Sequence, residues 1–426
     1  MKTNQSQTAP AEVRENIMGT MEINPLLLKL SIPMMISMLV QALYNVVDSV
    51  FVSHVSESAL TAVSLAFSLQ NVMIAVGVGT GVGVNALLSK SLGEKNQSRA
   101  NATAENGIFL SLCSFVVFFV IGLTCMKPYF YAQTSDPVIA QQGIQYLSVC
   151  CIFSLGIFTQ TMGEKLLAAT GRTHLSMISQ LVGAVVNIIL DPIFIFAFGM
   201  GVRGAALATI LSQGLSCIWV LRFLTGPKTL LRLKKENVRF RPALILPCVA
   251  LGTATFIMQA SESVISMCFN SSLLKYGDDI AVGAMTILSS VMQFAMLPLQ
   301  GIAQGAQPIT SYNYGARNTQ RVRQTFRLLL KVCLCYSVAL WAVIQLCPGA
   351  FARIFTPNAA LVAFTVPALR IYCGALFLFG IQIACQMTFV SIGAAGCSII
   401  VAVLRKFVLL LPLIYLMPRL LADQTM

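Results

Sequence analysis

Three carboxylates lie deep within the apolar stretches of this 426-residue chain, at Asp48, Asp191 and Glu262. An ionised carboxylate at the middle of a membrane costs about 2.5–3.5 kcal/mol on insertion scales, so each of them is a candidate functional group. Asp191 follows Asn187 by four residues, which places both side chains on one face of a helix. Carboxylate, amide and hydroxyl oxygens suit a proton or Na⁺. The sequence therefore predicts a proton or Na⁺ site formed by Asp48, Asn187, Asp191 and Thr209, with Glu262 as a separate candidate acid.

The composition around these residues predicts a membrane protein. Hydrophobic residues make up 57% of the chain and charged residues only 10%, which is more apolar than a soluble domain requires. A helix needs about 20 apolar residues to cross hydrocarbon. We therefore expect an all-α, polytopic protein with eleven spans, near 25–52, 58–88, 103–126, 138–161, 174–199, 204–224, 244–270, 280–310, 326–346, 367–390 and 399–418.

The chain also repeats itself at an offset of 222 residues, so that Gly93 and Asn96 recur as Gly315 and Asn318. A repeat of this length indicates a duplicated domain, and two homologous apolar halves are typical of secondary transporters. We expect two homologous six-helix lobes, with the twelfth helix missing, because a copy of helix 6 would end beyond residue 426. The expected parts are a cytoplasmic tail (1–24), an amino-terminal lobe with helices 1–6 (25–224), a basic cytoplasmic linker (225–243) and a carboxy-terminal lobe with helices 7–11 (244–426).

The net charge of +13 is explained by topology rather than by nucleic-acid binding. The Lys and Arg residues lie in short loops between apolar runs and form no basic stripe with interleaved aromatics. Most of them, including Lys165, Arg405 and Lys406, fall on one side if the amino terminus is cytoplasmic. An odd number of spans then places the carboxy terminus outside.

Two further patterns concern helix shape and packing. The run GVGTGVG at 77–83 contains glycines four residues apart, which predicts close helix packing. Pro33 lies inside the first span and is a candidate bending point.

Several strings together resemble the multidrug and toxic compound extrusion (MATE) family of cation-coupled efflux transporters. They are IPMMISMLVQALYNVVDSVFV, SLGEKNQSRA, NIILDPIFIF followed by GVRGAALATILSQ, and ITSYNYGARNTQRVR. The resemblance implies two six-helix lobes around a V-shaped cavity. It also implies export of amphipathic, often cationic drugs in exchange for H⁺ or Na⁺ by alternating access of the two lobes. Asp48, Asn187, Asp191 and Thr209 match the family's ion site in the amino-terminal lobe.

In the second lobe, Glu262 resembles a carboxylate used by another branch of the family. The second carboxylate of that branch has no match, because Gln382 and Gln386 stand in the corresponding segment. For the substrate cavity we expect Gln41, Tyr44 and Asn71, with Met258 and Met292 as an adaptable apolar wall. A monomer in the cell membrane is expected, surrounded by lipid, with small amphipathic substrates, no nucleic-acid partner and no cofactor besides the coupling ion.

Three alternatives remain open at this point. The chain could be a lipid-linked oligosaccharide flippase of the same superfamily, or a non-transporting remnant that lacks one helix. An intramembrane aspartyl protease is disfavoured, because the glycine-aspartate motif of those enzymes is absent around Asp48 and Asp191. We therefore do not expect an enzyme.

Overall fold

The computed structural model describes residues 16–226, 229–231, 233, 241–276 and 279–422. Every regular element within these residues is a helix, which confirms the predicted all-α class. In chain order the elements are α1 (Ile17–Thr20), α2 (Ile23–Ser53), α3 (Glu57–Gly93), α4 (Gln97–Thr124), α5 (Met126–Gln133), α6 (Pro137–Ile152), α7 (Leu155–Ala169), α8 (Thr173–Pro192), η1 (Ile193–Ala197), α9 (Val202–Leu224), α10 (Pro242–Tyr276), α11 (Asp279–Gly315), α12 (Thr319–Leu346), α13 (Pro348–Phe355), α14 (Ala359–Tyr372), α15 (Leu376–Ile392), α16 (Ala395–Val403), η3 (Leu404–Leu410) and α17 (Leu411–Ala422). The elements η1 and η3 are π-helical.

Many of these helices are long and apolar enough to cross a membrane. The described residues contain 9 such helices, or up to 11 spans if each of two bent pairs, α6 with α7 and α14 with α15, counts as one. The bends in these pairs are 50° and 46°. The chain is therefore a multi-pass membrane protein, whereas the missing twelfth helix stays a prediction.

The 222-residue offset holds for the backbone as well as for the sequence. The bounds of α3, α4 and α5 shifted by this offset are those of α11, α12 and α13. The loop before α4 contains Lys95 at a φ of 55°, and the loop before α12 contains Arg317 at a φ of 56°. Each is followed by an asparagine that caps the next helix, because Asn96 accepts from the backbone of Arg99 (2.9 Å) and Asn318 from that of Arg321 (3.1 Å).

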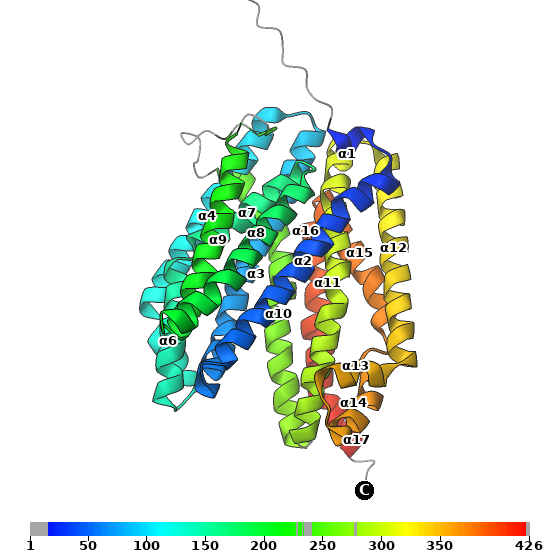
Figure 1. Cartoon of the computed structure of the whole chain (residues 1–426). Coiled ribbons are helices and arrows are strands. Elements are labelled where there is room, and N and C mark those ends of the chain that lie inside the picture. The colour runs from blue at the N-terminus through cyan, green and yellow to red at the C-terminus, as the bar shows by residue number, and fades with distance from the viewer. Residues whose placement is uncertain (1–15, 227–228, 232, 234–240, 277–278, 423–426) are drawn as a thin grey trace, which may run out of the picture.

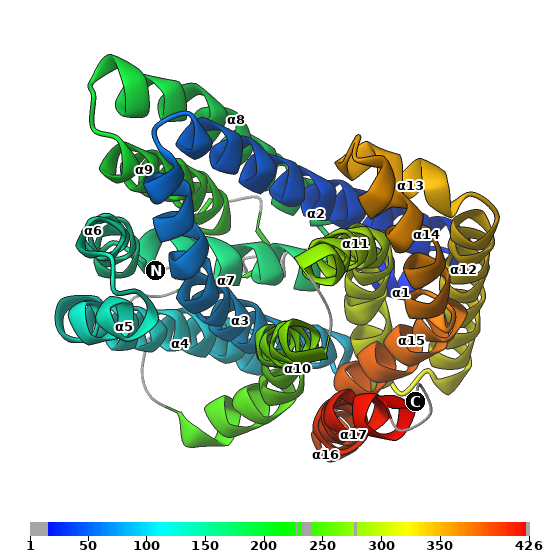
Figure 2. The same ribbon diagram turned by 90° about the horizontal axis from the view of Figure 1, so that it is seen from below.

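The helices form two groups that lie side by side (Figure 2). The amino-terminal half comprises α2–α9, and the carboxy-terminal half comprises α10–α17. Helix α2 crosses diagonally between them (Figure 1). Its first turns, with Leu26 and Leu30, belong to a core with residues of α11, α12 and α15, whereas Val52 near its end packs in the core of the amino-terminal half. Pro33 lies between these two environments, within a continuous helix.

Glycines allow the two halves to approach backbone to backbone. A Cβ atom on Gly83 would lie 1.9 Å from the carbonyl oxygen of Cys248, and one on Gly252 would lie 2.4 Å from that of Gly79. The predicted close packing of the GVGTGVG run is thereby confirmed, since α3 packs along α10. We call this contact line between α3, α10 and α11 the seam.

The seam continues at the ends of α3 and α11, where two contacts mirror each other. A Cβ on Gly93 would lie 1.9 Å from the carbonyl oxygen of Tyr312, and one on Gly315 would lie 2.1 Å from that of Lys90. The 222-residue offset relates these two contacts to each other. Helices α1 and α17 lie at opposite ends of the bundle (Figure 1).

Candidate cation and substrate site

The predicted pair Asn187 and Asp191 lies fully buried near the end of α8, where their exposures are 1% and 0%. The Asn187 amide Nδ2 donates to Asp191 Oδ1 at 3.3 Å. The other two oxygens, Asn187 Oδ1 and Asp191 Oδ2, are buried without a hydrogen-bond partner among the described residues. A buried acceptor that lacks a donor is costly, so this pair is suited to receive a proton or a cation.

Asp48 lies on α2, which packs against α8. Its Oδ1 is also buried without a partner among the residues described. The carboxylates of Asp48 and Asp191 are close enough to act on each other electrostatically, and Tyr44, one turn before Asp48, feels both of them. The structure thus gathers acceptor oxygens from α2 and α8, with no donor assigned to three of them.

Thr209 is buried on α9, which packs along α8. Its hydroxyl donates to the carbonyl of Ala205 at 3.0 Å, within its own helix. The oxygen keeps lone pairs for a second partner. Its hydrogen bond, however, does not connect it to either aspartate.

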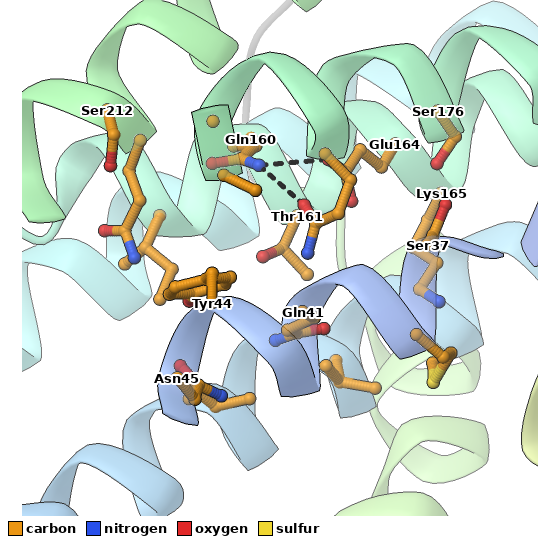
Figure 3. Close-up of a pocket in the computed structure, with 18 of the residues that line it drawn as sticks. Ser37, Gln41, Tyr44, Asn45, Gln160, Thr161, Glu164, Lys165, Ser176 and Ser212 are labelled. Carbon is orange, nitrogen blue, oxygen red and sulfur yellow. Dashed lines mark hydrogen bonds between the residues drawn. The ribbon is translucent and has the colours of Figure 1, made fainter. Parts of the chain in front are cut away.

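A cavity of about 100 Å³ opens beside these residues, between α2, α3, α7, α8 and α9, with one residue from α11. Of the predicted substrate residues, Gln41 and Tyr44 line it, and on α2 they face Gln160, Thr161 and Glu164 of α7 (Figure 3). The remaining lining includes Met34, Met38, Phe67, Gln70, Ser176, Gln180, Gly183, Ala184, Gln213 and Gln304.

The other three predicted substrate residues do not line this cavity. Asn71 follows the lining residue Gln70 on α3, and one step along a helix turns its side chain by about 100°. Met258 lies on α10, and Met292 packs against an apolar core of the carboxy-terminal half. The wall of the described cavity is thus much more polar than predicted.

Glu164 is the acid that sequence reasoning missed. Gln160 Nε2 donates to Glu164 Oε1 and to Gln180 Oε1, both at 3.0 Å, and Figure 3 shows this group facing the cavity. A carboxylate accepts only, so Glu164 fixes the orientation of the Gln160 amide. Gln160 Oε1 is then left buried without a partner in the described part of the chain. We call Gln160, Glu164 and Gln180 the amino-terminal relay.

Lys165 was predicted in a loop, and this was wrong. It lies inside α7 with an exposure of 7%, and its ammonium group donates to Gln304 Oε1 of α11. This hydrogen bond joins the two halves of the molecule at the cavity. The prediction failed because the charged pair at 164–165 was taken as the end of a span. A better signal was Gly171, whose φ of +79° marks the real end of the helix.

Arg405 and Lys406 were also predicted in a loop, whereas both lie in the π-helix η3 within a span. Lys406 is buried and forms an ion pair with Glu262 of α10. Glu262 is therefore distant from the acids of the amino-terminal half, and its charge is matched by a cation of the chain itself.

Comparisons with known proteins agree with this arrangement. Multidrug export protein MepA of Staphylococcus haemolyticus is 23% identical over 353 residues, which cover 82% of this chain and 77% of that protein. A MOP superfamily transporter from Pyrococcus furiosus superposes with a TM-score of 0.89 at 25% identity, covering 96% of this chain and 92% of its own.

A crystal structure of MATE in complex with MaL6 has the same TM-score of 0.89 at 25% identity, covering 95% of this chain and 91% of its own. The MatE family model matches residues 33–193 and 254–416, which hold the acids of both halves. With this match over most of its length, and with a transporter fold around a polar cavity, the chain belongs to the MATE family of transporters.

Proposed function

We propose that this protein is a secondary active antiporter that exports amphipathic, cationic compounds in exchange for H⁺ or Na⁺. The observation that carries the proposal is the set of three buried acceptor oxygens, on Asp48, Asn187 and Asp191, that have no donor among the described residues. Protons or Na⁺ entering this set would satisfy oxygens that otherwise remain unpaired at high cost. The printed name of the MepA relative, a multidrug export protein, supports the same substrate class.

Tyr44 supports coupling between ion and substrate. Its side chain lines the cavity, and it interacts electrostatically with Asp48, Asp191 and Glu164. A change of charge at the aspartates therefore acts on a residue that contacts the substrate. The Lys165–Gln304 hydrogen bond crosses between the halves beside the same cavity, so movement of one half relative to the other changes the cavity wall.

For the cellular setting, we propose a monomer in the cell membrane with a cytoplasmic amino terminus. The site requires no cofactor besides the coupling ion, and the partners are lipid and small-molecule substrates rather than nucleic acid. The basic loops around Lys95 and Arg317, at the same end of the bundle as the seam glycines Gly93 and Gly315, support this orientation.

The test is accumulation of rhodamine 123, an amphipathic cation, in everted vesicles that contain the full chain. A pH gradient and a Na⁺ gradient are applied separately, each at zero membrane potential. We expect uptake with one gradient and its collapse when an ionophore for that ion is added. Uptake that requires ATP, or no uptake with either gradient, would overturn the antiport proposal.

A further inference from the structure

The carboxy-terminal half contains a second chain of amide groups. Gln382 and Gln386 lie one turn apart on α15, and Arg405 of η3 donates from Nη1 to Gln382 Oε1 at 2.5 Å. Gln382 Nε2 in turn donates to Gln386 Oε1 at 2.5 Å. Arginine has donors only, so Arg405 fixes the orientation of both amides. We call these three residues the carboxy-terminal relay.

This orientation leaves a free donor at the end of the relay. Gln386 Nε2 is buried, with 4% exposure of the residue, and has no hydrogen-bond partner among the described residues. The hydroxyl of Ser398, two turns before Arg405, is likewise buried and unpaired within the described chain. Buried polar groups are almost always paired, so two unpaired groups beside one another's helices indicate an absent ligand.

The charges of the cluster indicate which ligand fits. Lys406 is matched by Glu262, whereas Arg405 contacts a neutral amide and the ring of Phe379, with 5.1 Å between guanidinium and ring centre. A polarised chain that starts at a guanidinium strengthens the donor at its far end. The half-buried Gln382 and the exposed Glu262 connect the cluster to the surface. A free donor with a positive group behind it suits an anionic oxygen.

The amino-terminal relay has the opposite polarity. Gln160 and Glu164 shifted by 222 residues are Gln382 and Gln386, and the first relay ends in a free acceptor, Gln160 Oε1. Ser398 is the counterpart of Ser176, which lines the amino-terminal cavity. Two related positions thus present an acceptor in one half and a donor in the other. In addition, Arg405 lies in a π-helical segment, a feature that is frequent at functional sites.

We propose that Gln386, Ser398 and Arg405 bind the carboxylate of a transported compound, an inference that rests on the proposed export function. The transported class then includes amphipathic compounds that carry an acidic group together with a basic one. The carboxylate accepts from Gln386 Nε2 and the Ser398 hydroxyl, and the Arg405 guanidinium stabilises it through the relay.

The test uses two dyes with the same cationic ring system: rhodamine 110, which has a carboxylate, and rhodamine 123, its methyl ester. Binding to the purified full chain in detergent is measured by fluorescence anisotropy, without any gradient. Gln386→Glu keeps the shape of the side chain but replaces the free donor by an acceptor. We expect it to weaken rhodamine 110 binding about tenfold or more, equivalent to about 1.4 kcal/mol, and to leave rhodamine 123 binding unchanged.

Arg405→Gln is a second variant with the same expected selectivity, and Arg370→Gln is the matched control. Arg370 is exposed in the same half, so its loss should affect neither dye. Equal losses for both dyes, or an unchanged affinity for rhodamine 110, would overturn the proposal. Because no gradient is present, this outcome is separate from failure of the proposed function, which appears as absent rhodamine 123 transport.

A free anion from solution is the competing source of the same chemistry. Binding of both dyes to the unmodified chain is therefore repeated with chloride replaced by gluconate. We expect no change for either dye. Loss of rhodamine 123 binding when chloride is removed would assign the site to a free anion and overturn the assignment to the substrate.

Discussion

In the amino-terminal half Gln160 donates to Glu164, whereas in the carboxy-terminal half the related Gln382 donates to Gln386 and accepts from Arg405. Next to the first relay, Gly183 and Ala184 line the cavity. The same positions of the second half are Arg405 and Lys406. Long basic side chains thus occupy positions that are small in the first half.

The backbone of the two halves does not differ in this way. Ser89 donates to the carbonyl of Ala169 at 3.3 Å, and Ser311, its counterpart, donates to that of Ser391 at 2.9 Å. Gly171 and Gly393 both adopt a positive φ, of 79° and 88°. Helix ends and helix contacts have therefore been kept, while a few side chains inside each half determine the charge that a ligand meets.

The largest expected effect concerns the acids, which are concentrated in the amino-terminal half. One charge that crosses about 100 mV provides about 2.3 kcal/mol, or roughly a fiftyfold substrate gradient. Asp48→Asn should reduce rhodamine 123 accumulation in everted vesicles from this order to background. Asp136→Asn is the control, since Asp136 caps α6 outside the cavity and Asn caps equally well. Unchanged accumulation in Asp48→Asn would contradict a coupling role.

The next prediction tests whether the seam is equivalent in both halves. Gly93→Ala and Gly315→Ala each place a Cβ within 1.9–2.1 Å of a carbonyl oxygen of the other half. Each should destabilise the protein by about 1–3 kcal/mol, as overpacking does. Thermal unfolding in detergent measures the effect.

The control for the seam variants is Gly214→Ala on α9, where a Cβ would meet nothing within 4 Å. It should be neutral or stabilising, because Ala favours a helix. A large loss in only one seam variant would show that the two contacts are not equivalent.

A smaller effect separates the two relays. Glu164→Gln removes the carboxylate from the amino-terminal relay but keeps its shape. We expect the affinity for rhodamine 123 and for rhodamine 110 to fall alike, by roughly tenfold, because both dyes carry the cationic ring. Gln386→Glu should instead affect rhodamine 110 alone. If Glu164→Gln discriminated between the dyes, the assignment of opposite polarity to the two halves would be wrong.

The smallest expected effect concerns the helix caps. Asn96→Ala and Asn318→Ala each remove one cap, at α4 and α12, and should each cost about 1 kcal/mol in the free energy of unfolding. Replacement by Asp should restore the stability at both positions. Thermal unfolding of the four variants measures this, and unequal losses at the two caps would limit the equivalence of the halves.

The sequence was sufficient to predict those features that depend on local spacing. The four-residue interval between Asn187 and Asp191 placed both on one face of α8, and the glycine run at 77–83 identified close helix packing. The relays were harder to predict, because Glu164, Lys165 and Arg405 are charged and were taken as loop residues. Their burial depends on partners more than 15 residues away, such as Gln180 for Gln160 and Gln382 for Arg405. Only the packed helices bring these groups together.

The mirrored contacts of Gly93 and Gly315 have a consequence for symmetry. Gly93 meets the carbonyl of Tyr312 while Gly315 meets that of Lys90, so each half offers the other the same surface. An interface of this kind is isologous, as in a homodimer with a two-fold axis. The two halves therefore meet as two subunits of a dimer joined into one chain. Substitutions that open such a contact on one side have a partner position, at a known distance along the chain, where the same change should act again.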